Sequence, residues 1–280
     1  MRVIDFRLRP PFGAFADLIV FRDPARTARL ARELGFEIAP SVRERSMDLL
    51  LQEMDSIGCR CGVITGRTGT VFGSIDNRVI GEVVAAHPGR FVGATYVAPH
   101  DRKAALAEID RAMQAGFRAV VMEPGLAQPP WHMDDARLYP IYERLESANV
   151  PLVFMAGGNA GPDLAYTSPE HVDRVARDFP GLRIVLAHGG WPWVSEILHV
   201  CYRRPNLWLS PDMYLFGGMP GALDYVNAAN GFMAERFLFA SAYPVLPLPA
   251  AVRAFLDFPI RPEVADRLLY RNAARLLGLD

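Results

Sequence analysis

Short apolar runs recur along the 280-residue chain, and each is followed by a stretch with helical periodicity. The runs are rich in branched and aromatic residues and lack a polar alternate face, which is typical of strands buried on both sides of a parallel sheet. We predict eight such strands, at residues 2–6, 61–65, 91–97, 118–122, 151–155, 183–188, 206–210 and 236–240.

Amphipathic segments separate these runs. In the first of them, Leu50, Met54 and Ile57 fall on one helical stripe, and Gly116 and Ser168 stand where a helix should end and begin. Strict alternation of eight strands with helices predicts a single (β/α)8 TIM barrel, with no second domain within residues 1–280. The helices are expected at 43–57, 76–86, 102–115, 136–148, 169–178, 192–200, 220–229 and 262–277.

Charge and composition narrow the class of protein. The net charge is -1, with 30 Lys+Arg against 31 Asp+Glu, so the chain lacks the basic field of a nucleic-acid binder, and we expect no nucleic-acid partner. No secretory leader and no apolar run of membrane-spanning length is evident, so the expectation is a cytoplasmic protein with no membrane partner. Cys59, Cys61 and Cys201 are too few for a disulfide framework and are interpreted as buried thiols.

Loops rich in proline and glycine follow several strands, at 9–13, 124–130, 157–162 and 217–221. In a barrel such loops gather at the C-terminal face, where the chemistry resides. The segment GGNAG at 157–161 lacks the lysine and spacing of a phosphate loop. The side chains at the strand ends predict a polar, locally basic pocket for a small anionic substrate: Arg7, Arg9, Thr65, Tyr96, Glu123, Met155, His188, Ser210, Asp212, Ala242 and Tyr243.

Four segments carry a family resemblance: IDFRLRP, PLVFMAGG, IVLAHGGWPW and ERFLFASAYPVLP. From residue 3 to about 277 the chain resembles the amidohydrolase superfamily, in the amidohydrolase-related branch of aminocarboxymuconate-semialdehyde decarboxylase, aromatic-acid decarboxylases and lactone hydrolases. The resemblance implies a TIM barrel that holds a divalent metal and activates water. Members of this family are often homodimers, so a homodimer is a further expectation.

The metal ligands of that family are mostly replaced in this chain. An HxH pair on strand 1 becomes Arg7 and Arg9, a histidine on strand 5 becomes Met155, and an aspartate on strand 8 becomes Ala242; His188 alone matches. Arginine is always protonated and has no lone pair to give, so it cannot be a ligand. We therefore predict no metal and no cofactor.

Two arginines can take over one role of a divalent metal, because they carry the same total charge and match a carboxylate bidentately. We expect Arg7 and Arg9 to bind the substrate carboxylate. They cannot lower the pKa of water as a metal does, so a protein base is required. The candidates for catalysis are His188, Asp212 and Glu123; each could instead serve only as a hydrogen-bonding or ion-pairing group in the barrel mouth.

Other residues near the strand ends are expected to contact the ligand. They are Tyr96, Met155, Asn159, Trp191, Tyr214 and Tyr243, and Phe216 could join the tyrosines in an apolar wall. Core packing is the alternative for the aromatic side chains.

Three functions remain open at this point. The first is a metal-independent hydrolase of a small carboxylated ester, lactone or ring compound. The second is a decarboxylase, another lyase or an isomerase of a carboxylated ring, which needs no water. The third is a non-catalytic protein that binds a small anion after losing its metal site. Two arginines in register argue against simple drift, because random loss leaves neutral residues more often.

Overall fold

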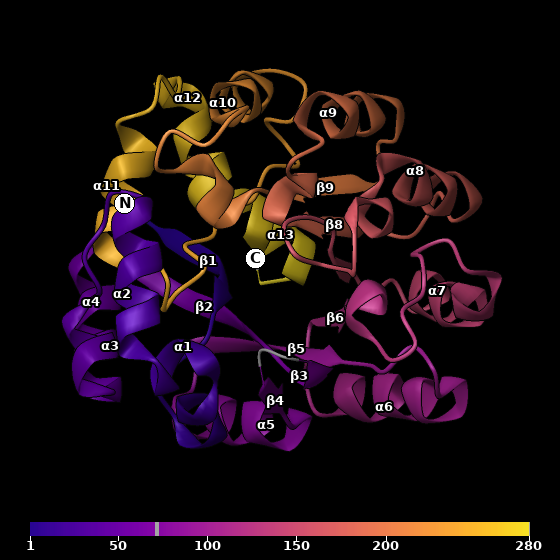
Figure 1. Cartoon of the computed structure of the whole chain (residues 1–280), viewed down its shortest axis with the longest axis horizontal. Helices are drawn as coiled ribbons and strands as arrows, with labels where there is room; N and C mark the ends of the chain where they lie inside the picture. The colour runs from indigo at the N-terminus through magenta and orange to yellow at the C-terminus, as the bar shows by residue number, and fades with distance from the viewer. Residues whose placement is uncertain (71–72, 280) are drawn as a thin grey trace.

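Parallel strands form the centre of the molecule, and helices surround them (Figure 1). The computed structural model describes residues 1–70 and 73–279. Its main sheet has the order β1-β2-β5-β6-β7-β8-β9, and each strand pairs in parallel with its neighbour. The strands are β1 (Val3–Leu8), β2 (Cys59–Thr65), β5 (Phe91–Tyr96), β6 (Ala119–Met122), β7 (Leu152–Met155), β8 (Ile184–Ala187) and β9 (Leu207–Ser210).

The segment expected as the eighth strand closes the ring without forming a regular strand. Leu238 donates its amide to the Leu209 carbonyl at 2.9 Å, and Phe6 donates to the Phe239 carbonyl at 3.0 Å. In the described residues, the pairing of this segment with β9 and β1 is limited to two isolated bridges, Leu209 with Phe237 and Leu8 with Tyr243, beside these hydrogen bonds. The TIM barrel is thus confirmed, while the regular strand expected at 236–240 is reduced to a few backbone contacts.

A buried carboxylate takes the place of the missing ladder. Asp5 accepts hydrogen bonds at one oxygen from the Arg7 amide at 3.1 Å and the Ser241 amide at 2.9 Å. Its other oxygen accepts from the Ser241 hydroxyl at 2.5 Å, and Asp5 is 0% exposed. Because amides on both sides of the seam bond to this side chain, they do not bond to carbonyls as in a regular strand pair.

Most predicted helices occur, with shifted ends. The expectation at 169–178 matches α8, whereas 43–57 divides into α3 and α4, and 262–277 divides at a π-helical turn, Arg267–Arg271. The helices are α1 (Ile19–Arg22), α2 (Pro24–Glu33), α3 (Pro40–Glu44), α4 (Met47–Ser56), α5 (Asn77–Ala86), α6 (Arg102–Gln114), α7 (Tyr139–Ser147), α8 (Pro169–Asp178), α9 (Val194–Arg203), α10 (Ala222–Asn230), α11 (Leu248–Leu256), α12 (Pro262–Asp266) and α13 (Asn272–Leu277).

Several elements were not expected, among them α1, α2, α11 and the antiparallel pair β3 (Arg67–Thr70) and β4 (Gly73–Ile75). None of the helices in the described parts of the chain is long and apolar enough to cross a membrane.

The core has two layers, as burial of both sheet faces requires. On β8, Val185 and Ala187 pack inside the barrel, while Ile184 and Leu186 pack outward against the helices. The three cysteines are buried, as expected, and burial raises the pKa of Cys61 to about 11 and of Cys201 to about 12.

The Asp5 seam makes the stability of the protein dependent on pH. Burial raises the pKa of Asp5 from 3.8 to about 6, so the folded state disfavours the ionised form. The contribution of this group is therefore fully present below pH 3.8 and is lost as the pH rises through about 6. Asp5→Asn keeps the acceptor oxygen and does not ionise. We predict that its free energy of unfolding rises by about 3 kcal/mol relative to that of wild type between pH 4 and pH 7.

Urea unfolding at both pH values measures this difference. Asp17→Asn, at an exposed position, is the matched control and should show no such change. Asp5→Ala should lose stability at both pH values, because it leaves three buried donors without an acceptor. If the free energies of unfolding of Asp5→Asn and wild type differ by the same amount at pH 4 and pH 7, the pKa of Asp5 is not raised in the folded protein.

Candidate active site

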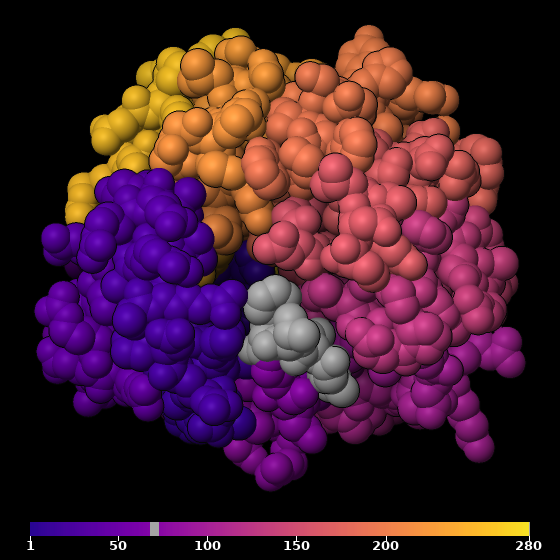
Figure 2. Space-filling model, viewed as in Figure 1, coloured from indigo at the N-terminus to yellow at the C-terminus, as the bar shows by residue number. Residues whose placement is uncertain are grey.

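A pocket of about 480 Å³ opens at the C-terminal ends of the strands. Figure 2 shows its mouth as the hollow near the centre of the face, between the N-terminal segment and the orange C-terminal part of the chain. Its floor carries charge and its walls are largely apolar. The lining includes Arg7, Arg9, Leu18, Thr27, Leu30, Arg67, Glu123, Met155, Asn159, His188, Met213, Tyr214, Met219, Ala242 and Val245.

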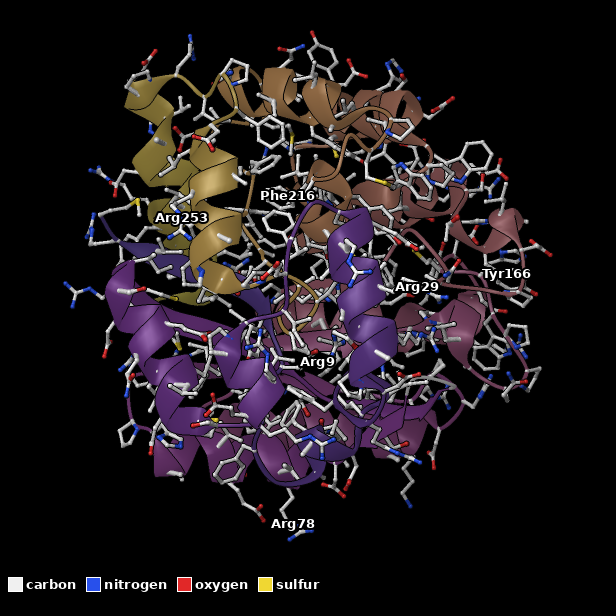
Figure 3. All side chains as sticks on the ribbon, turned by 60° about the vertical axis from the view of Figure 1, so that its left-hand side comes forward. Arg9, Arg29, Arg78, Tyr166, Phe216 and Arg253 are labelled. Atoms are coloured by element: carbon white, nitrogen blue, oxygen red, sulfur yellow. The ribbon has the colours of Figure 1, made fainter. Side chains whose placement is uncertain are left out.

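An N-terminal cap, residues 13–34, forms one wall of the pocket (Figure 3). Its main helix, α2, begins at Pro24 because Asp23 caps it, accepting a hydrogen bond from the Arg26 amide at 2.9 Å. Thr27 then donates to the Val20 carbonyl at 2.7 Å, which ties α2 to α1. This wall was not expected, since α2 was not among the predicted helices.

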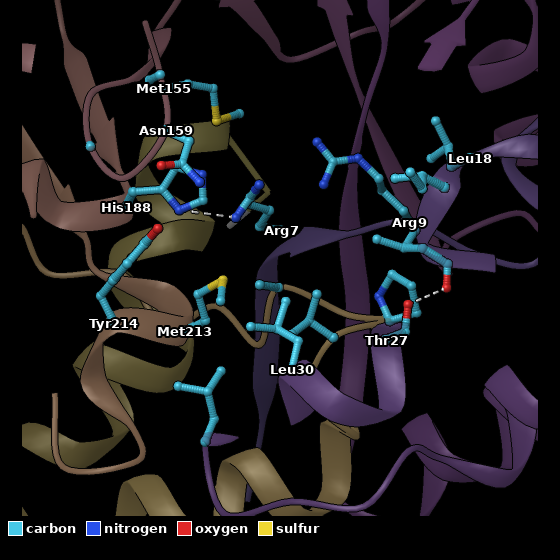
Figure 4. Close-up of a pocket in the computed structure, with 18 of the residues that line it drawn as sticks. Arg7, Arg9, Leu18, Thr27, Leu30, Met155, Asn159, His188, Met213 and Tyr214 are labelled. Carbon is cyan, nitrogen blue, oxygen red and sulfur yellow. Dashed lines mark hydrogen bonds between the residues drawn. The ribbon is translucent and has the colours of Figure 1, made fainter. Parts of the chain in front are cut away.

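Arg7, Asp212 and His188 form a hydrogen-bonded cluster, and Figure 4 shows the contact between Arg7 and His188. Arg7 Nη1 donates to Asp212 Oδ2 at 2.8 Å, and His188 Nδ1 lies 3.1 Å from Asp212 Oδ1 and 3.3 Å from Arg7 Nη1. Asp212 is 0% exposed and also accepts from the Met213 amide at 2.6 Å. It lies behind the lining, so it holds Arg7 and His188 and does not face the cavity.

The ionisation of this cluster follows from its surroundings. Burial opposes charge on Asp212, but His188 and Arg7 offset it, and the pKa of Asp212 is lowered. Burial, and then the charge of Arg7, lower the pKa of His188 below 6.5. His188 is therefore a neutral imidazole near pH 7, with one ring nitrogen turned toward the Asp212 carboxylate.

Three residues at this face adopt the left-handed backbone conformation that glycine prefers. They are His188 (φ 64°), Asp212 (φ 47°) and Ala242 (φ 55°), each at the end of a strand or of the closing segment. Such a conformation costs about 1 kcal/mol or more for a non-glycine residue and clusters at functional sites. At His188 and Asp212 the fold retains this strain at the two residues that bond to each other.

A second buried ion pair lies across the floor. Arg67 donates through Nε to Glu123 Oε2 at 3.1 Å, and its Nη2 bonds to Glu123 Oε1. Glu123 is 2% exposed, so it does not point into solvent, and its carboxylate is occupied by Arg67. Arg67 was missed, although it stands two residues after the last residue of β2, much as Arg9 stands one residue after the last residue of β1.

Arg9 is buried without a protein partner. Its side chain lines the pocket, it is 7% exposed, and the described residues offer its guanidinium no hydrogen bond or ion pair. Burial, then the charges of Arg67 and Arg7, lower the pKa of Arg9. Figure 4 shows Arg7 and Arg9 among the side chains that line the pocket. The charge of Arg9 is left for a ligand to neutralise.

Tyr214 forms an aromatic wall beside His188. Its ring stacks on Trp191 at 4.9 Å and meets the His188 ring edge-on at 5.3 Å. The loop after β7 approaches this wall so closely that a Cβ on Gly158 would lie 2.0 Å from the Tyr214 hydroxyl. This contact, together with a φ of +62° at Gly158, explains the GGNAG segment without a phosphate-binding role.

The structure places seven of the expected residues at the pocket: Arg7, Arg9, Glu123, Met155, Asn159, His188 and Tyr214. The other four lie elsewhere. Asp212 is behind the floor and Trp191 stacks behind Tyr214. Tyr96 lines a separate surface groove between α5 and α6, and Tyr243 is fully buried with its hydroxyl 2.8 Å from Ser41 Oγ. Tyr243 is thus not placed to contact a ligand. Tyr96 is not part of the pocket lining, although its hydroxyl lies near enough to Glu123 and Arg67 for their charges to act on its pKa.

The residues present do not fit the divalent metal that the family resemblance implies. Arg7 and Arg9 bring positive charge to the ligand positions, and Met155 and Ala242 offer neither a carboxylate nor an imidazole. Within residues 1–70 and 73–279, no three His, Cys, Asp or Glu side chains are grouped so that they could hold an ion. His188, the one matching ligand, bonds to Asp212 beside a guanidinium.

Fold and site define an α/β-barrel protein with a small-molecule pocket at the C-terminal face of its strands. A family model for amidohydrolases matches residues 63–279, so the chain belongs to the amidohydrolase family. The resemblance that the four sequence segments carried is therefore confirmed. Among curated proteins, no sequence matches the chain.

Solved structures agree with the barrel fold. An uncharacterized TIM-barrel protein from Bordetella bronchiseptica is 46% identical over 99% of both chains, with a TM-score of 0.95. A 2,6-dihydroxybenzoate decarboxylase from Rhizobium is 18% identical over 100% of this chain and 99% of its own, with a TM-score of 0.74. A probable 2-pyrone-4,6-dicarboxylic acid hydrolase from Acinetobacter baumannii, with citric acid bound, is 14% identical over 99% and 100%, with a TM-score of 0.68. The last two likenesses establish the fold alone.

The ion pair between Arg67 and Glu123 yields a stability prediction. Glu123→Gln should cost about 3 kcal/mol, because it removes the buried carboxylate charge that pairs with the Arg67 guanidinium. The double variant Arg67→Met/Glu123→Leu removes both charges and should cost much less than the sum of the two single changes. Urea unfolding of all four proteins measures the coupling, and additive losses would show that the pair is not coupled.

Proposed function

We propose that the protein is a metal-independent hydrolase of the amidohydrolase family, acting on a small carboxylated ester, lactone or ring compound. Arg9, with Arg7 beside it, binds the carboxylate, and His188 is the general base. The observation that carries this proposal is the buried Arg9 guanidinium, for which the described residues provide no partner.

The charge balance of the floor favours an anion. Three guanidinium groups, those of Arg7, Arg9 and Arg67, face two carboxylates, those of Asp212 and Glu123. His188 is neutral near pH 7, because its pKa is lowered. One positive charge is thus in excess, and a monoanionic carboxylate would neutralise it with the bidentate geometry that guanidinium prefers.

The walls favour a substrate with an apolar body. Leu18, Leu30, Met155, Met213 and Val245 line the space above the charged floor. A carboxylate attached to a ring or short apolar group fits such a combination, since pockets of this kind use a few polar groups to orient a mostly apolar ligand. The named functions of the Rhizobium and Acinetobacter structures, both concerned with carboxylated ring compounds, support this class.

The chemistry divides between two protein groups. Asp212 holds Nδ1 of His188 as the protonated ring nitrogen, which leaves Nε2 free to accept a proton from water. The hydroxide that forms attacks the carbonyl carbon, and a guanidinium stabilises the negative charge on the carbonyl oxygen. The intermediate then collapses, the C–O bond to the leaving group breaks, and His188 returns the proton to the departing oxygen. The net reaction consumes one water.

Decarboxylation is the second candidate, favoured by the likeness in fold to a decarboxylase. In that reaction a C–C bond breaks, CO₂ leaves, and the carbon takes up a proton. A neutral His188 has a free nitrogen to accept a proton but no spare one to donate, which favours hydrolysis. Mass spectrometry of products from a library of carboxylated esters, lactones and arenes separates the two reactions. Hydrolysis adds one water, about 18 Da, to a lactone or to the summed products of an ester, whereas decarboxylation removes CO₂, about 44 Da.

We predict that Arg9→Met weakens carboxylate binding and stabilises the folded protein. It should raise the Kd for benzoate at least about tenfold, because the uncompensated charge is lost. It should also raise the free energy of unfolding by about 1 to 3 kcal/mol, because a buried cation without a protein partner is removed. Calorimetric titration and urea unfolding test the two effects.

The matched control is Arg78→Met, on an exposed face of α5, which should change neither quantity appreciably (Figure 3). If Arg9→Met binds benzoate as wild type does, the carboxylate is held elsewhere and the proposal fails.

His188→Gln gives a prediction about the reaction itself. Once a substrate is identified from the library, this variant should lose about 10²- to 10⁴-fold in kcat, as expected for removal of a general base. Its KM should change little, because the carboxylate contact at Arg9 is kept. A KM increase with unchanged kcat would make His188 a binding residue and would refute its role as base.

A further inference from the structure

A second, much smaller cavity lies inside the barrel beneath the pocket. Its volume is about 10 Å³, and side chains from β1, β2, β7, β8 and β9 enclose it. Arg7 and Met155 line both this cavity and the pocket above, so they form the partition between the two. Its remaining polar lining consists of Thr65 and Ser210; the other residues are apolar.

Each of its three polar side chains carries a buried atom without a protein partner. The atoms are Arg7 Nε, Thr65 Oγ1 and Ser210 Oγ, none of which has a hydrogen-bond partner among the groups of the described residues. The residues are 8%, 3% and 1% exposed, respectively. Because buried polar side-chain atoms are nearly always hydrogen-bonded, three exceptions around one small cavity indicate a common partner.

Size and chemistry identify that partner. A single water needs a cavity of about 10 to 15 Å³ and two to four polar contacts. The guanidinium Nε–H can only donate, whereas each hydroxyl can donate or accept. A water molecule can accept from Arg7 Nε and donate to the two hydroxyls, which satisfies all three atoms at once.

We infer that this cavity binds one water molecule, hydrogen-bonded to Arg7, Thr65 and Ser210, and that Thr65 and Ser210 are positioning residues for Arg7. Asp212 holds Arg7 through Nη1 at 2.8 Å. The water would hold it through Nε, so the guanidinium would be fixed at two points on opposite sides. This inference about the water does not depend on the proposed reaction.

The first experiment is a crystal structure of the wild-type protein at about 1.5 Å resolution. We expect one density peak within about 2.7 to 3.2 Å of the three polar atoms. An empty cavity would overturn the inference. So would an anomalous peak at this position after a bromide soak, because it would identify a halide site that accepts from all three groups.

Variants test the positioning role. In crystals of Thr65→Val/Ser210→Ala the peak should vanish, and Arg7 should show a second conformer or higher displacement relative to Arg9. Val153→Ala is the matched control, since it widens the cavity and keeps both hydroxyls; the peak should persist. An unchanged Arg7 in the double variant would refute the positioning role.

A solution measurement separates positioning from general loss of stability, and this part rests on the proposed carboxylate binding. Thr65→Val should raise the Kd for benzoate about threefold or more. Thr95→Val is the control. It removes a buried hydroxyl outside the pocket that donates to Glu108 at 2.6 Å, so it should lower stability without changing this Kd. Equal affinity in both variants would count against positioning, whereas failure of wild type to bind benzoate would reject the proposed function and leave the crystallographic test in force.

Discussion

The buried ion pair between Arg7 and Asp212 is the constraint on which the site depends. It joins β1 to Asp212, two residues beyond the end of β9, across the seam where the closing segment lacks a regular ladder. Two charges with so little access to water are costly unless each is neutralised and hydrogen-bonded, and here both conditions hold. The pair also fixes His188, whose ring bonds to the same carboxylate. Barrel closure and the orientation of the imidazole thus share one interaction.

Replacement of metal ligands by arginine changes how such a barrel can work. A metal supplies charge and activated water together, whereas guanidinium groups supply charge and directed donors only. In this chain the floor divides these tasks. Arg7 and Arg67 are committed to carboxylates within the protein, and Arg9 keeps its charge for the pocket. In the proposed reaction, the proton-accepting role falls to the His188 imidazole, which Asp212 holds in place.

Much of the barrel could be predicted from the sequence, because strands buried on both faces leave continuous apolar runs and helices between them keep a stripe. The helix α8 shows this well, since Ser168-Pro169 marks its start and an apolar stripe runs to Asp178. The helix α2 escaped detection, because PARTARLARE is polar on most faces and buries only Thr27 and Ala31. The closing segment was predicted as a regular strand, since its apolar residues cannot reveal that the Asp5 side chain replaces ladder carbonyls. The roles of Asp212 and Arg67 depend on contacts between distant strands, which local patterns do not encode.

The cap wall of the pocket is one short segment near the N-terminus, whereas the residues of the charged floor stand at the ends of several strands. The family match begins at residue 63, whereas Arg9 and the cap of residues 13–34 precede it. The cap contributes apolar side chains such as Leu18 and Leu30 but none of the buried ion pairs. Exchange of this short segment can therefore alter which carboxylates are admitted while barrel closure and the charged floor remain intact. Under the proposed function, the cap and the ion-paired floor let substrate range and fold stability change separately.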